Sequence, residues 1–94
     1  MNAIRLECTT GGHNKFYEFL GIQTNGRFTV KGRYGAIGQA PKEPIIYYGD
    51  SKTEAEKEFE RKMAEKRRKG YVVVTRNGNL VQPTPEEKKT LMFP

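Results

Sequence analysis

The stretch SKTEAEKEFERKMAEKRRKG, residues 51–70, decides the fold class because it predicts one long helix. Its start is a capping box, in which Ser51 accepts from the backbone N–H of Glu54 while the Glu54 side chain reaches back. The helix should run to about Lys69, because Gly70 is a natural stop and cations fill the last turn. Three residues recur at intervals of four and form a single apolar stripe: Ala55, Phe59 and Met63. A helix with one apolar stripe is expected to pack on one face of a sheet.

Apolar and alternating runs on both sides of this helix predict strands. They cover residues 4–8, 15–23, 27–34 and 45–48 before the helix, and residues 71–75 after it, with a return through 80–81. Asn25-Gly26 is a strong signal for a two-residue hairpin turn. The prediction is an α+β fold, with a small antiparallel sheet of about four to five strands and one long α-helix packed on one face.

The length of 94 residues predicts one domain with a tail. We place the domain at residues 1–82 and the tail at 83–94. The tail is polar apart from Leu91, Met92 and Phe93, and residues 84–87 carry a signal that could cap a short final helix. Whether the tail packs on the domain stays open at this point.

The net charge of +6 favours anionic partners. No apolar run approaches the ~20 residues that span a bilayer, so a membrane is not among the expected partners. The single cysteine, Cys8, allows neither an intrachain disulfide nor a cysteine-based zinc site. No apolar signal segment opens the chain, and we expect a cytoplasmic protein. The oligomeric state stays open.

The glycine-rich stretch GRYGAIGQAP, residues 32–41, is not a nucleotide-binding loop. A dinucleotide fingerprint must open a helix directly, whereas the predicted helix begins only at Ser51. His13, the only histidine, sits in a glycine-rich turn, and no carboxylate pair or metal-ligating cluster is present. We therefore expect no enzyme, no cofactor and no metal.

Basic residues cluster in two places. Arg27, Lys31 and Arg33 share one face of the third predicted strand, and Arg67 and Arg68 lie at the end of the helix. Both groups suit phosphate contacts, although the helix cations also complement the helix dipole. Tyr34 has two interpretations: its parity matches the apolar face of the strand, and its ring could instead stack on a base or sugar.

Three stretches of the chain resemble the WGR domain, the DNA-binding module of DNA-dependent poly(ADP-ribose) polymerases, which also occurs in bacteria. These are Asn14-Lys15-Phe16-Tyr17, the run from Arg33 to Gln39, and the helix with its ending Lys66-x-x-Lys69-Gly70-Tyr71. The resemblance spans about residues 3 to 75. Tyr34-Gly35-Ala36 stands where the family has Trp-Gly-Arg.

The resemblance implies a role in binding broken DNA ends. In the polymerases the tryptophan packs against the terminal nucleotide, and the asparagine before Lys-Phe-Tyr approaches the backbone. By this match Asn14, Lys15 and Tyr34 inherit those roles, whereas Ala36 does not supply the arginine, and Arg33 is the nearest substitute. The expected nucleic-acid-binding residues are Asn14, Lys15, Arg27, Lys31, Arg33, Tyr34, Gln39, Arg67 and Arg68. We expect a non-enzymatic module that binds DNA ends or breaks; the alternative is a protein-interaction adaptor whose basic surface meets an acidic partner.

Overall fold

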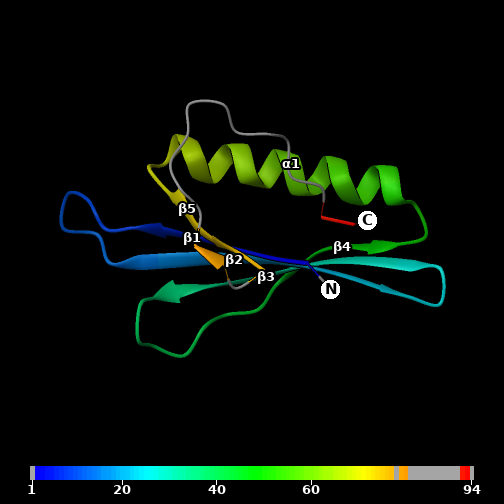
Figure 1. Cartoon of the computed structure of the whole chain (residues 1–94), viewed down its shortest axis with the longest axis horizontal. Coiled ribbons are helices and arrows are strands. Elements are labelled where there is room, and N and C mark those ends of the chain that lie inside the picture. The colour runs from blue at the N-terminus through cyan, green and yellow to red at the C-terminus, as the bar shows by residue number, and fades with distance from the viewer. Residues whose placement is uncertain (1, 78, 81–91, 94) are drawn as a thin grey trace.

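The computed structural model describes residues 2–77, 79–80 and 92–93, and these form a sheet with a helix on one face (Figure 1). The sheet is antiparallel and has six strands in the order β4-β3-β2-β1-β5-β6. The strands are β1 (Asn2–Cys8), β2 (Lys15–Thr24), β3 (Arg27–Ala36), β4 (Ile45–Gly49), β5 (Val72–Arg76) and the two-residue β6 (Asn79–Leu80). The predicted α+β fold is confirmed.

The central hairpin of the sheet joins β2 and β3 through the predicted turn. Asn25 and Gly26 both have positive φ, at 52° and 73°, as a type I′ turn requires. The pairing then runs from Thr24 opposite Arg27 to Lys15 opposite Ala36. Both faces of β2 carry apolar side chains, and β2 indeed lies inside the sheet, between β1 and β3.

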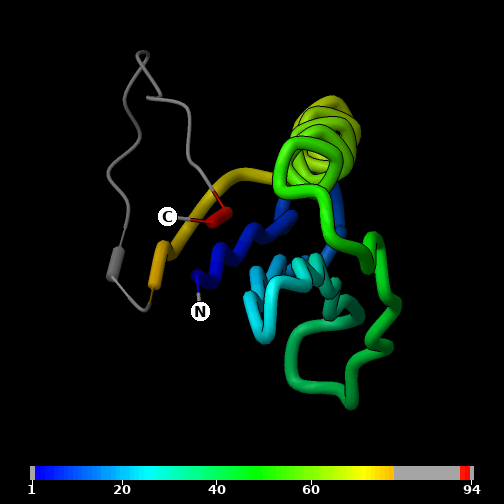
Figure 2. Tube along the Cα trace, turned by 90° about the vertical axis from the view of Figure 1, so that its right-hand side faces the viewer, coloured from blue at the N-terminus to red at the C-terminus, as the bar shows by residue number. Residues whose placement is uncertain are grey.

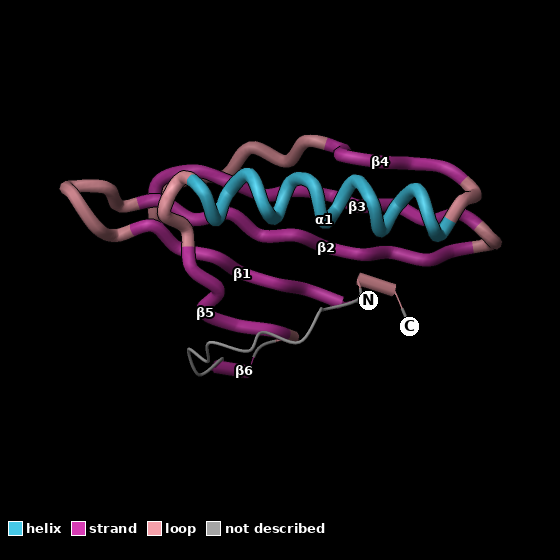
Figure 3. The backbone as a smooth tube through the Cα atoms, turned by 90° about the horizontal axis from the view of Figure 1, so that it is seen from above, coloured by secondary structure: helices cyan, strands magenta, loops and turns pink. Residues whose placement is uncertain are grey.

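The helix α1 (Lys52–Arg68) ends as its sequence predicts, but only half of the predicted capping box forms, because the Ser51 N–H donates to the Tyr47 hydroxyl oxygen at 3.3 Å instead of to Glu54. Ser51 Oγ accepts from the backbone N–H of Glu54 at 3.1 Å. Gly70 stops the helix at a φ of +95°, and its N–H donates to the carbonyl oxygen of Arg67. Seen from above in Figure 3, α1 runs along β2 and β3. The helix therefore extends from one end of these two strands to the other.

The core lies between α1 and one face of the sheet. The apolar stripe of α1 is buried as expected, and the Phe59 ring meets Phe19 edge to face at 5.3 Å between centroids. The other buried members on the strands include Ile4, Leu6, Cys8, Tyr17 and Val30. Burial of Cys8 agrees with its expected place on an apolar strand face. The described part of the chain contains no helix long and apolar enough to cross a membrane.

Two residues of the C-terminal tail belong to this same core. Met92 is fully buried and Phe93 is 1% exposed. Figure 2 shows them on the side of the sheet that carries α1. The tail therefore reaches the domain at these two residues, a point that the sequence left open. The helix predicted for residues 84–87 and the boundary at residues 82 and 83 lie outside the described residues.

Candidate nucleic-acid interface

The three stretches that resemble the WGR domain meet at one end of the sheet. At that end β2 begins and β3 finishes, so that Lys15 pairs with Ala36 and Tyr17 with Tyr34. The N–H of Ile37 donates to the carbonyl oxygen of Asn14 at 3.0 Å, which ties the loop after β3 to the turn before β2. The end of α1 arrives at the same place, and Lys69 and Gly70 connect it to Tyr71.

Tyr34 is the most exposed aromatic ring at this end of the sheet. It lies parallel to Tyr17, with ring centroids 5.5 Å apart and planes inclined by 6°. Tyr17 is buried, whereas Tyr34 is 36% exposed. The structure thus combines the two interpretations of Tyr34, because one side of its ring packs on the core and the remainder faces solvent.

A cleft lies between Tyr34 and the last turns of α1. It has a volume of about 570 Å³ and is lined by Tyr17, Tyr34, Pro44, Ile45, Ile46, Arg61, Lys62, Glu65, Lys66 and Lys69. The Lys66 ammonium lies 4.7 Å from the Tyr17 ring centroid, within the range of a cation–π contact. Burial, followed by repulsion from Lys69, holds the pKa of Lys66 below its usual value. An anion in this cleft would relieve that penalty, since it favours the charged ammonium.

A second, shallower depression lies on the other side of Tyr34. It has a volume of about 400 Å³ and is lined by Gly12, His13, Asn14, Lys15, Tyr34, Gly35, Ala36 and Tyr71. The Lys15 ammonium lies 6.0 Å from the Tyr71 ring centroid, and the Lys66 ammonium lies 5.8 Å from the same centroid. Three tyrosines and two lysines therefore form one continuous group, which we call the tyrosine–lysine cluster: Lys15, Tyr17, Tyr34, Lys66 and Tyr71.

Tyr17 and Tyr71 add no negative charge to this cluster at neutral pH. Burial, with a further contribution from Tyr34, raises the pKa of Tyr17 to about 12. Burial likewise raises the pKa of Tyr71. The aromatic floor of the cluster is therefore neutral while the lysines above it are positive, which is the electrostatic character that a phosphate-bearing ligand requires.

The strand cations predicted to bind DNA lie away from this cluster. Lys31 and Arg33 project from the opposite face of β3, because side chains alternate along a strand and Tyr34 faces the helix side. Both are paired with acids there: Lys31 lies 3.5 Å from Glu43, and Arg33 lies 3.1 Å from Glu43 and 3.9 Å from Glu18. Arg27 stands at the hairpin end of β3, seven residues and about 23 Å from Tyr34.

The remaining predicted residues fall at the rim. Asn14 and Lys15 line the second depression beside Tyr34. Gln39 is exposed in the turn after β3, where its N–H donates to the carbonyl oxygen of Ala36 at 3.1 Å. Arg67 and Arg68 are exposed in the last turn of α1 and line neither hollow.

The residues of this surface that were not among those predicted to bind include Tyr17, Lys62, Lys66, Lys69 and Tyr71. A signal for four of them was present, since Tyr17, Lys66, Lys69 and Tyr71 belong to the stretches that resemble the family. Their common position required the register of β2 and β3 and the direction of α1. Within residues 2–77, 79–80 and 92–93, no group of His, Cys, Asp or Glu side chains is placed to hold a metal ion.

Comparison with protein families places the chain in the class that its sequence resembles. The WGR domain matches residues 2–78, which is well over half of the chain. No curated protein and no solved structure matches it. The residues that carry the resemblance gather around one stacked tyrosine pair, where Tyr34-Gly35-Ala36 stands in place of Trp-Gly-Arg. The chain belongs to the WGR domain family.

Proposed function

We propose that this protein is a non-enzymatic DNA-binding module that uses the tyrosine–lysine cluster to bind DNA ends or breaks. WGR domains form a family of nucleic-acid-binding modules. The observation that carries the proposal is the Tyr34 ring, which packs on Tyr17 yet is 36% exposed between two hollows lined by lysines.

The partly exposed ring supports a preference for ends over intact duplex. Inside a duplex both faces of each base are covered by neighbouring bases, whereas the last base pair or an unpaired nucleotide has a free face. A tyrosine ring can stack on that free face or pack on the sugar, and such a contact contributes about 1–3 kcal/mol per base. The ring is already held against Tyr17, so little side-chain freedom is lost when the ligand arrives.

The lysines support phosphate binding because they stand on either side of the ring. Lys15, at the start of β2, lines one of the two hollows that border Tyr34, and Lys66, on α1, lines the other. By contrast, Lys31 and Arg33 already have carboxylate partners on the opposite face. We therefore place the footprint on the helix side of the sheet, at the end where β3 finishes. We also propose that the protein is cytoplasmic.

The test is a set of anisotropy titrations with blunt, nicked, single-stranded and circular DNA at about 50 mM salt. We expect binding to blunt and nicked duplexes to exceed binding to a circular duplex of equal mass concentration. With four to six phosphate contacts, log K should fall against log salt with a slope of about −4 to −5. Absence of binding to all four DNAs would reject the proposal and favour the alternative, an adaptor that binds an acidic protein.

A further inference from the structure

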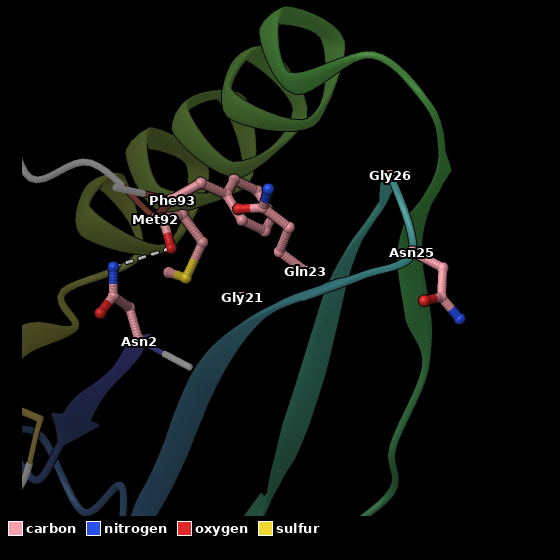
Figure 4. Close-up of a pocket in the computed structure, with 7 residues that line it drawn as sticks. All are labelled: Asn2, Gly21, Gln23, Asn25, Gly26, Met92 and Phe93. Carbon is pink, nitrogen blue, oxygen red and sulfur yellow. Dashed lines mark hydrogen bonds between the residues drawn. The ribbon is translucent and has the colours of Figure 1, made fainter.

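The pair Met92–Phe93 packs between the first half of α1 and the hairpin end of β2 and β3, a position that we call the groove, and it borders an open hollow of about 330 Å³. Figure 4 shows the two residues below the helix, with Asn2 and Gly21 beside them. Met92 is fully buried and Phe93 is 1% exposed. The pair is therefore as buried as the central residues of the core, although it comes from a distant part of the chain.

Side chains of the domain grip the backbone of this pair. The carboxylate of Glu56 accepts from two successive N–H groups, at 3.2 Å from Met92 and 2.8 Å from Phe93. The side-chain amide of Asn2 donates to the carbonyl oxygen of Met92 at 3.0 Å (Figure 4). Hydrogen bonds to a charged group are stronger than those between neutral groups. These side-chain contacts hold the backbone of the pair, which belongs to no strand of the sheet.

Both side chains of the pair pack closely against residues of β2 and β3. The Phe93 ring meets Phe28 edge to face at 5.2 Å between centroids. Met92 lies against Gly21 so closely that a Cβ there would stand 2.5 Å from Met92 Cγ and 2.6 Å from its carbonyl oxygen. A glycine inside a strand often marks such an approach of a second backbone. Gly21 thus gives the groove its depth.

The walls of the groove and its occupant come from different parts of the chain. The residues that contact the pair, Asn2, Gly21, Phe28 and Glu56, all lie within residues 2–78, which match the WGR domain, whereas Met92 and Phe93 lie outside that match. The groove is also remote from the tyrosine–lysine cluster. Glu56 and Lys66 are ten residues apart on α1, about 15 Å along the helix.

We propose that this groove is a peptide-binding site, occupied by the chain's own C-terminal pair as an intramolecular ligand. The peptide that it accepts has an apolar residue followed by phenylalanine, with both backbone N–H groups free for Glu56. Proline at either position is excluded because it lacks that N–H. The domain then has two separate binding surfaces, since the groove shares no residue with the tyrosine–lysine cluster.

The first experiment titrates a labelled synthetic peptide of residues 83–94 into two full-length proteins, the wild type and the variant Met92→Ser with Phe93→Ser. The variant should bind at least about 10-fold more tightly, because the wild-type groove is already filled by a tethered copy at an effective concentration near the millimolar range. Failure of the folded variant to bind the peptide would overturn the proposal.

Two changes test whether Glu56 recognises the peptide backbone. Adding Glu56→Ala to the serine variant should weaken peptide binding by about 10-fold or more, since a charged acceptor for two N–H groups is lost. A peptide methylated on the Phe93 nitrogen should lose a similar factor with the same side chains. The matched control is Glu58→Ala, which removes a glutamate of the same helix that pairs with Arg61 instead. Equal effects of the two alanine changes would refute the backbone contact.

Hydrogen exchange on the wild-type chain keeps the proposal testable if the serine variant does not fold. A docked ligand leaves its groove without unfolding the sheet, so the amides of Met92 and Phe93 should exchange at least about 10-fold faster than the amide of Phe19 in β2. Equal rates for all three amides would show that the pair opens only with the whole domain, and the proposal would then be wrong.

Discussion

The ring of Tyr34 stacks on the ring of Tyr17 on the helix side of the sheet. The ring centroids are 5.5 Å apart, and the ring planes are inclined by only 6°. Lys31 and Arg33, the neighbours of Tyr34 in sequence, point to the opposite face and are held by Glu43. This relationship decides which cations can act together with the exposed ring. A substitution at Tyr34 should therefore change both the free energy of unfolding and the affinity for DNA, and the two effects can be measured separately.

Tyr34→Ala is expected to lower both stability and DNA affinity, each by a moderate amount. Loss of the stacked pair should reduce the free energy of unfolding by about 1–2 kcal/mol, because only one side of the ring is packed. Affinity for DNA ends should fall by about 1–3 kcal/mol. Thermal unfolding and anisotropy titration measure the two effects. Tyr48→Ala, at a tyrosine that is 66% exposed on β4, is the control and should change neither. An unchanged affinity in Tyr34→Ala would contradict the stacking role.

Neutralising the lysines of the cluster should reduce the salt dependence of DNA binding. In the variant Lys15→Gln with Lys66→Gln, the slope of log K against log salt should become shallower by about 2, because two phosphate contacts are removed. The matched variant, Lys31→Gln with Arg33→Gln, removes the same charge from the opposite face and should leave the slope nearly unchanged. If the second variant has the larger effect, the footprint lies on the face that the sequence favoured.

The pKa of Tyr17 gives a stability signature at high pH. Its usual value is 10.0, and burial raises the pKa of Tyr17 to about 12 in the folded protein. Below pH 10 both states hold the proton, so this contribution is constant. Between about pH 10 and 12 the unfolded chain loses the proton first, and the free energy of unfolding falls as pH rises.

Tyr17→Phe removes that titration and is the measurement that isolates it. Urea unfolding at about pH 9 and about pH 11.5 should show a steeper loss of stability in the wild type than in the phenylalanine variant. Ionisable groups far from Tyr17 contribute equally in both proteins and cancel in the difference. Parallel loss in the two proteins would show that Tyr17 ionises as easily folded as unfolded.

Gly21→Ala should destabilise the protein because the added Cβ collides with Met92, a contact whose nearest distances include a backbone atom. Overpacking of this kind lowers the free energy of unfolding by about 1–3 kcal/mol. Gly35→Ala is the control, since the nearest atoms to a Cβ there are 3.7 Å away at ordinary contact distance. Thermal unfolding compares the two variants, and equal melting temperatures would show that Met92 does not pack against Gly21.

Several features of the fold could be predicted because their causes are local. Ser51 caps α1 through an N–H only three residues away, and the Asn25-Gly26 turn depends on the φ angles of two adjacent residues. The pattern of apolar residues in β2 likewise predicted a strand inside the sheet. Of the residues predicted to bind, Asn14, Lys15 and Tyr34 line the surface that we propose, whereas Lys31 and Arg33 lie on the opposite face of β3.

The sequence by itself determined the helix, the strands, the hairpin and membership of the WGR domain family, because capping, periodicity and motif spacing act over a few residues. Only the tertiary structure decided that Tyr34 stacks on Tyr17, that Lys66 stands over the same ring, and that Glu56 holds the backbone of Phe93. The two residues of each contact are separated by between 17 and 49 positions in the sequence. These contacts exist because strand register and the direction of α1 bring distant segments together, and no local pattern encodes that geometry.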